Sequence, residues 1–306
     1  MRLNWIATTG LLAVVFLSGC AALPATPIRM GRPQSALSSQ NASSISSPAM
    51  SGSGHDQFSA VSSNGPVNQE SSCSSPIDAE FGRQSAVVDA VGNVIGIPRK
   101  ILLWDRRADN HRVSGTTVGE VSDYLIMNGL TDVKVRVNQY APMDEWRRLV
   151  HNRRIAPGWK YTVGVLKHLE YSIFPGRIWG GDEYNPFTNS VSLYSDIPSP
   201  GLAESAYAKN IHSQSYPGTY ATAQLLPIIG LQHESLATDD AMSYVQTFGS
   251  SDDLSATRRI LYARYGMEVG SNLGGLFHVQ GVQLGGVGQA IGAAGGHVAA
   301  GMQQDH

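Results

Sequence analysis

The 306-residue chain has few cysteines, no excess of basic charge and none of the common hydrolase or nucleotide motifs. Its two cysteines are too few to form a disulfide framework. A formal net charge of −2 gives no basic face, so we expect no nucleic-acid partner. The chain contains no G-x-S-x-G nucleophile elbow and no glycine-rich phosphate loop between a strand and a helix. Serine hydrolases and nucleotide-dependent enzymes are therefore disfavoured.

Long apolar runs are also scarce, and the run near the start is too short to span a bilayer comfortably. It covers residues 11–17 and ends in Leu-Ser-Gly-Cys at 17–20. A small residue followed by cysteine at this place resembles the lipobox of bacterial lipoproteins, which implies cleavage of residues 1–19 and acylation of Cys20, palmitate included. We therefore expect a lipid anchor in the cell envelope, and Ala21 after the cysteine favours the outer membrane facing the periplasm. An ordinary transmembrane anchor or a plain signal peptide is the alternative.

Composition divides the remaining chain into three segments. Residues 20–76 are rich in Ser, Gly, Pro, Asn and Gln and predict a disordered tether. Residues 77–270 have the composition of a globular domain, and residues 271–306 form a glycine-rich C-terminal segment.

The glycine-rich segment has no Lys, Arg, Asp or Glu between residues 269 and 304. Small residues recur there every four positions, at Gly288, Gly292, Gly296 and Ala300. This spacing predicts a helix with one small-residue face that another helix can approach closely. We expect tight packing on the protein's own core or on the membrane surface, with a membrane span as the alternative.

The globular part mixes helical and strand patterns, which predicts an α+β fold. We expect helices over 84–97, 117–130, 143–150, from Ser199 onward, from Thr219 or after Pro227 to 248, and over 254–269. We expect strands over 101–104, 133–137 and 190–194, the second of them half-buried because it alternates strictly. Residues 161–171 fit both periods, and residues 180–189 have turn chemistry.

The order of turn, strand and helices in the second half resembles a known family. The strand is followed by a helix reading Leu-Ala-Glu-Ser-Ala-Tyr-Ala-Lys at 202–209, and a later helix carries His-Glu-Ser-Leu-Ala-Thr at 233–238. This arrangement resembles the zincin metallopeptidases. The segments 104–107, 181–189 and 193–196 look like those of an uncharacterised group of bacterial lipoproteins with a zincin-like domain, in which H-E-x-G-H-A-K-D follows the strand.

The resemblance covers about residues 101–265 and implies a zincin-like fold, with a small sheet whose edge strand is followed by packed helices. In that family the edge strand binds extended substrate. Two histidines one helical turn apart hold zinc, a glutamate between them polarises water, and a third ligand comes from a following helix.

This chain departs from the family pattern at the metal ligands. Ala203 and Tyr207 stand where the pattern has its histidines, and Asn210 stands where it has aspartate, whereas Glu204 and Lys209 remain. Alanine has no donor atom, and a phenol with a pKa near 10 is a poor zinc ligand at neutral pH. We therefore expect Glu204 to be a vestigial base, no metal or other cofactor, and a pseudoenzyme, although enzyme activity stays open.

Glu234 fits a vestigial third ligand. It lies on an otherwise apolar helical stripe formed by Leu231, Thr238, Ala241 and Val245. A glutamate there is costly unless it meets a partner, and Tyr207 is a candidate donor; partial exposure at a helix edge is the alternative. His212 and His233 are weak candidates for a metal site with Glu234 and Glu204, because none of them shows one-turn pairing.

The function expected is that of a lipid-anchored envelope protein that binds a peptide or protein partner without cleaving it. The groove expected near 187–194 would take an extended peptide by strand addition. The expected binding residues are Asn185, Phe187, Asn189, Tyr194, Tyr207 and Glu234. One alternative is an active zinc metallopeptidase with unusual ligands and Glu204 as base, and another is a structural envelope lipoprotein that assembles through its glycine-rich tail.

Overall fold

The described part of the chain belongs to one unit, residues 68–306. The computed structural model describes residues 77, 79–83, 85–275, 278–279, 282–283 and 285–303. The expected signal segment 1–19, the lipid-bearing Cys20 and the expected tether 20–76 lie outside these residues. Among the described helices, none combines the length and the apolar character needed to cross a membrane.

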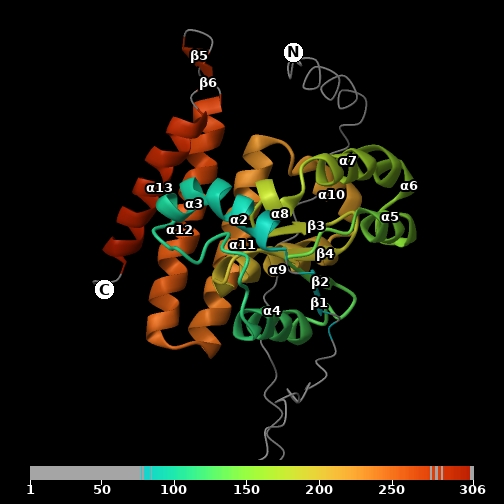
Figure 1. The fold of residues 1–306 in the computed structure, drawn as a ribbon, viewed down its shortest axis with the longest axis horizontal. Helices are drawn as coiled ribbons and strands as arrows, with labels where there is room; N and C mark the ends of the chain where they lie inside the picture. The colour runs from blue at the N-terminus through green and yellow to red at the C-terminus, as the bar shows by residue number, and fades with distance from the viewer. Residues whose placement is uncertain are drawn as a thin grey trace, which may run out of the picture. The chain divides into compact units, whose positions relative to one another are not determined.

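The described elements make a mostly helical α+β fold with a small mixed sheet, which confirms the expected class (Figure 1). The strands are β1 (Ala79–Phe81), β2 (Lys134–Val137), β3 (Glu183–Asn185), β4 (Ser190–Leu193), β5 (His278–Val279) and β6 (Val282–Gln283). The helices of the first half are α2 (Ala86–Ile95), α3 (Ile97–Leu102), α4 (Gly115–Met127), α5 (Pro142–His151), α6 (Pro157–Trp159), the π-helix η2 (Lys160–Gly164), α7 (Val165–Ile173) and α8 (Gly176–Trp179). Those of the second half are α9 (Pro198–Ser213), α10 (Pro217–Ala223), α11 (Pro227–Phe248), α12 (Ser251–Gly275) and α13 (Gly285–Met302).

The larger sheet has the strand order β1-β2-β4-β3. β1, β2 and β4 are parallel, and β3 is an antiparallel edge strand. Val135 lies opposite Val191, and Val137 lies opposite Leu193, so one face of the sheet is apolar. This face packs with Leu125 of α4 and its neighbours in the main hydrophobic core.

The other face of the sheet is polar but covered, which corrects the expectation that β2 is half-buried. Arg136 is fully buried there and forms an ion pair with Glu145 of α5, with 2.5 Å between Nε and Oε1. It also pairs with Asp144. Strict alternation in the sequence suggested a solvent-exposed face, whereas α5 covers it and supplies the carboxylates that a buried guanidinium needs.

Two further expectations need correction near α3 and α9. Residues 101–104 do not form a strand, because the short helix α3, with Pro98 in its first turn, runs to Leu102, and only Leu103 of the apolar run is buried. Trp104 is exposed and its ring stacks on His297 of α13, with centroids 4.0 Å apart. α9 begins at Pro198, one residue before the expected cap, Ser199. Proline is tolerated at the start of a helix because its missing N–H has no partner there.

Other helices follow the sequence closely. Residues 161–171, which fitted two periods, are helical in η2 and α7. The two expected starts of the later helix both occur, since α10 begins at Pro217 and α11 at Pro227. α12 continues to Gly275, beyond the expected end of the globular domain at residue 270.

The small-residue face predicted in the C-terminal segment packs on α12, which lies beside α13 (Figure 1). A Cβ atom added at Gly292 would lie 1.8 Å from the backbone oxygen of Gly266, and one added at Gly288 would lie 1.9 Å from that of Gly270. The two backbones therefore touch, and only glycine fits at these positions. Of the two packings expected, on the protein itself or on the membrane surface, the structure shows the first, against α12.

The start of β3 is fixed to the end of β4 by the buried side chain of Asp182. Its Oδ1 accepts the amide of Tyr194 at 2.6 Å and that of Ser195 at 3.0 Å. Burial, aided by the nearby Asp109 carboxylate, raises the pKa of Asp182 from 3.8 to about 6. Because the folded pKa lies above the unfolded value, this group favours the folded state when it is protonated.

We expect this contribution of Asp182 to be present below about pH 4 and to be lost as the pH rises through 6. The difference corresponds to about 3 kcal/mol of unfolding free energy. Asp182→Asn keeps the acceptor oxygen and does not titrate, so its stability should fall less than the native stability between pH 4 and 7. Denaturant unfolding at both pH values measures this, with the exposed Asp252→Asn as the control. An equal pH dependence in native protein and Asp182→Asn would contradict it.

Candidate functional site

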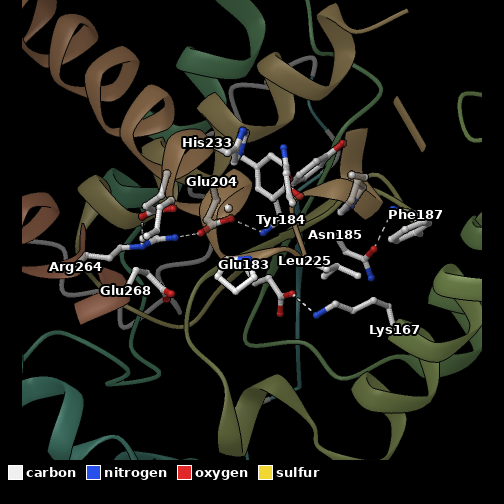
Figure 2. A pocket seen from close by; sticks show the side chains of 18 of the residues that line it. Lys167, Glu183, Tyr184, Asn185, Phe187, Glu204, Leu225, His233, Arg264 and Glu268 are labelled. Carbon is white, nitrogen blue, oxygen red and sulfur yellow. Dashed lines mark hydrogen bonds and ion pairs between the residues drawn. The ribbon is translucent and has the colours of Figure 1, made fainter. Parts of the chain in front are cut away.

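A cavity of about 370 Å³ lies where β3, α9, α11 and α12 meet (Figure 2). Its polar wall contains Glu204 of α9, Glu234 of α11 and Arg264 of α12. Lys167 of α7 and Glu183 of β3 lie on the side nearer the sheet. Five elements therefore bring charges from distant parts of the sequence to one place.

Glu204 is buried, with an exposed fraction of 4%, because α9 is surrounded by the sheet and by α4, α11 and α12. Its Oε2 accepts the backbone amide of Tyr184 at 2.7 Å. Its Oε1 accepts a hydrogen bond from Arg264. Burial raises the pKa of Glu204, and the neighbouring guanidinium limits that rise. Both oxygens of this carboxylate thus have partners within the protein.

Arg264 lies between two carboxylates (Figure 2). Besides Glu204, it contacts Glu234, with 2.9 Å between Nε and Oε1. Burial acts to lower the pKa of the guanidinium, but Glu234 and Glu204 outweigh it and raise that pKa above its ordinary value. The arginine is therefore a permanent cation, held where Glu204 and Glu234 converge.

Glu234 is partnered by Arg264, and Tyr207 contacts other groups. The Tyr207 ring lies edge-on to His233, with centroids 4.1 Å apart, and to Tyr184 at 5.2 Å. Burial, followed by the Glu204 charge, raises the pKa of the Tyr207 phenol well above 10. The expected Tyr207–Glu234 hydrogen bond is absent among the described residues, because the guanidinium of α12 reaches the carboxylate instead.

His233 is a buried neutral side chain in the cavity wall. Its exposed fraction is 5%, and its Nδ1 lies 3.3 Å from the hydroxyl of Tyr220. Burial and the Arg264 charge lower the pKa of His233 to about 4. Its Nε2 is buried without a hydrogen-bond partner in the described protein.

The structure brings together six of the expected site residues and separates three. Asn185, Phe187, Glu204, Tyr207, His233 and Glu234 all line the cavity. Asn189, Tyr194 and His212 do not line it. Cys20 lies outside the described residues.

The three residues outside the cavity have structural partners. The Oδ1 of Asn189 accepts the hydroxyl of Tyr184 at 2.8 Å and lies 2.9 Å from Nε2 of His212. Tyr194 is buried, and its amide donates to Asp182. The sequence pattern correctly placed these residues close to the cavity along the chain, but it did not indicate that their side chains make contacts within the fold.

Strand addition along residues 187–194 is not possible, because β4 is paired on both sides. The sheet has two edge strands, β1 and β3, and the one at the cavity is β3, which has three residues. The amide of Tyr184 at this edge already donates to Glu204, and Pro186 just beyond the strand has no N–H. A peptide backbone therefore finds few donors here.

The residues at the positions where the resemblance implied zinc ligands do not fit a zinc ion. Ala203 is 1% exposed and packs against Ala237 and Ala241 of α11, so its small side chain allows the two helices to approach. Tyr207 keeps its proton, and Arg264 places a positive charge between the remaining carboxylates. No group of three or more His, Cys, Asp or Glu residues that could hold a metal ion occurs in the described part of the chain. His212 does not join His233 and Glu234 in the cavity wall, because its Nε2 lies 2.9 Å from Oδ1 of Asn189 instead.

Sequence reasoning missed Arg264, Lys167, Gln224 and Glu268 as cavity residues. The glutamate on the apolar stripe of α11 was a signal for a cationic partner, but nothing in the sequence told which arginine would supply it. Comparisons of the chain with protein-family models, with curated proteins and with solved structures find no match.

Proposed function

We propose that this protein is a non-catalytic binding protein with a degenerate metallopeptidase-like domain, held at the bacterial cell envelope by lipid on Cys20. The single observation that carries the proposal is the bridge from Glu204 through Arg264 to Glu234. In an active zincin the positive charge at this place is the metal, which polarises water. A guanidinium also supplies positive charge, one unit instead of the two of zinc, but it offers no open coordination position.

The position of Glu204 also supports a loss of catalysis. A general base needs a free oxygen within hydrogen-bond reach of the water that it activates. Both oxygens of Glu204 are committed, one to Arg264 and one to the amide of Tyr184. The cavity next to it remains open and polar, which suits the recognition of a partner group.

The two alternatives make different demands on the chain. An active metallopeptidase with unusual ligands requires chelator-sensitive cleavage of peptides that disappears in Glu204→Ala while the fold persists. A structural lipoprotein that assembles through its tail requires a free small-residue face, whereas that face of α13 is in contact with α12. We expect no cleavage of unstructured peptides by the full chain, with or without added zinc, measured by mass spectrometry of the peptide products.

A further inference from the structure

Three polar atoms, on two side chains in the wall of the cavity, lack hydrogen-bond partners among the described residues. Nε2 of His233 and both amide atoms of Gln224 are buried without a partner in the described protein. Both residues line the cavity. A buried donor or acceptor without a partner costs about 1–3 kcal/mol. His233 and Gln224 therefore hold hydrogen-bonding capacity at the cavity wall that a polar ligand can use once the side chains rotate to expose these atoms.

The charge of the cavity decides the sign of that ligand. Its lining contains four glutamates, one lysine and one arginine, which is a formal excess of two negative charges, although burial raises the pKa of Glu183 and of Glu204. His233 does not offset this excess, because its pKa of about 4 leaves it neutral at pH 7. Glu268, one turn beyond Arg264 on α12, has no ion-pair partner within 4.0 Å among the described residues, although Arg264 attracts it at longer range. The ligand should therefore carry positive charge.

The remaining wall suits an aliphatic chain. It contains Ala221, Leu225, Pro227 and Leu231 together with the ring of Phe187. Figure 2 shows Leu225 and Phe187 on the side of the cavity away from Arg264. An alkyl stem with a terminal cation would place methylene groups against this wall and its charge near Glu268. Tyr207 adds an aromatic ring that can contact a cation.

We propose that the cavity binds a primary ammonium group on an aliphatic stem, in the form of a lysine side chain presented by a partner protein. The inference rests on the proposed function and names the chemistry of its ligand. Side-chain recognition is consistent with the β3 edge, where the amide of Tyr184 is taken and Pro186 has no N–H. Glu268 supplies the counter-charge, while the free nitrogen of His233 and the amide of Gln224 supply hydrogen bonds.

Isothermal titration of the full chain with four probes tests this proposal. The probes are acetyl-Gly-Lys-Gly-amide, its norleucine and arginine analogues, and free cadaverine. Hydrogen bonds to charged groups are worth about 1.5–3 kcal/mol, so we expect the lysine peptide to bind at least about tenfold more tightly than the norleucine peptide. The arginine peptide should bind more weakly than the lysine peptide. Cadaverine should bind more weakly too, if the ligand is a lysine within a protein.

Glu268→Gln should weaken binding of the lysine peptide by roughly two- to fivefold, the range of an exposed ion pair, and leave the norleucine peptide unaffected. Glu268 is exposed, so this variant should fold. Asp252→Asn, an exposed change at the start of the same helix, should alter neither affinity. Equal affinity for the lysine and norleucine peptides would overturn the proposal. Tighter binding of cadaverine or of the arginine peptide than of the lysine peptide would overturn the assignment of the ligand to a lysine side chain.

Mass spectrometry of the peptides after titration separates the two proposals. Intact peptides that fail to bind overturn the lysine assignment and leave the non-catalytic function standing. Cleaved peptides overturn the non-catalytic function itself, whatever their affinity.

Discussion

Replacing Arg264 by alanine should lower the free energy of unfolding by about 3–5 kcal/mol, the loss typical when one partner of a buried ion pair is removed. The guanidinium is shared by Glu204 and Glu234, so the variant leaves two carboxylates near one another without a counter-charge. Denaturant unfolding at pH 7 measures this loss. Arg259→Ala removes an exposed arginine from the same helix, and its stability should change by less than about 0.5 kcal/mol.

The same variant should change the pH dependence of stability. Burial already raises the pKa of Glu204 above its ordinary value of 4.5, and Arg264 is the group that opposes this rise. Without the arginine the folded pKa rises further above the unfolded one. The carboxyl then favours the folded state when protonated, and this contribution is lost as the pH rises through the folded pKa. Arg264→Ala should therefore lose more stability than the native chain between pH 5 and pH 8. Parallel pH profiles would show that the bridge does not hold the site together.

Gly292→Ala should destabilise the α12–α13 pair by about 3 kcal/mol, the upper part of the range for overpacking. The new Cβ would lie 1.8 Å from the backbone oxygen of Gly266, and a backbone atom cannot rotate away. Hydrogen exchange should show loss of protection along α13. The fluorescence of Trp104 should change too, because its ring stacks on His297 of that helix.

Gly295→Ala is the matched control on the same helix. A Cβ added there meets nothing within 4 Å, so the change should stabilise the helix by up to about 1 kcal/mol. Opposite signs at two glycines three residues apart would distinguish close backbone packing from a general effect of helix propensity. If both substitutions stabilise the protein, the contact between α12 and α13 is not as described.

Much of the fold could be predicted because, in several elements, the pattern of apolar residues in the sequence agrees with the burial of side chains in the structure. β2 and β4 alternate or bury short apolar runs, and α4 and α5 show clear helical periods. The glycine spacing of α13 predicted its close packing because every fourth residue falls on one face. The strand predicted over residues 101–104 was wrong because a short apolar run has no decisive period, and this run continues the helix that begins at Ile97 with Pro98 in its first turn.

The candidate site could be predicted only in part, since its chemistry depends on contacts between distant elements. Glu204 and Glu234 were found from the family pattern and from a charge on an apolar stripe. The identity of their partner was not, because Arg264 reaches them from a third helix. The sequence also did not indicate that the edge of β3 is blocked for strand addition, since this results from one contact between the side chain of Glu204 and the amide of Tyr184.

Zinc stoichiometry tests the central claim most directly, namely that Arg264 takes the place of a metal between the two glutamates. The full chain should be equilibrated with excess zinc, dialysed and analysed by mass spectrometry for metal per chain. The account predicts no retained zinc, because Ala203 has no donor atom, Tyr207 keeps its proton and the Arg264 guanidinium already occupies the space between the two carboxylates. Retention of about one zinc per chain, bound in a manner that Glu234→Gln abolishes without unfolding the protein, would contradict it.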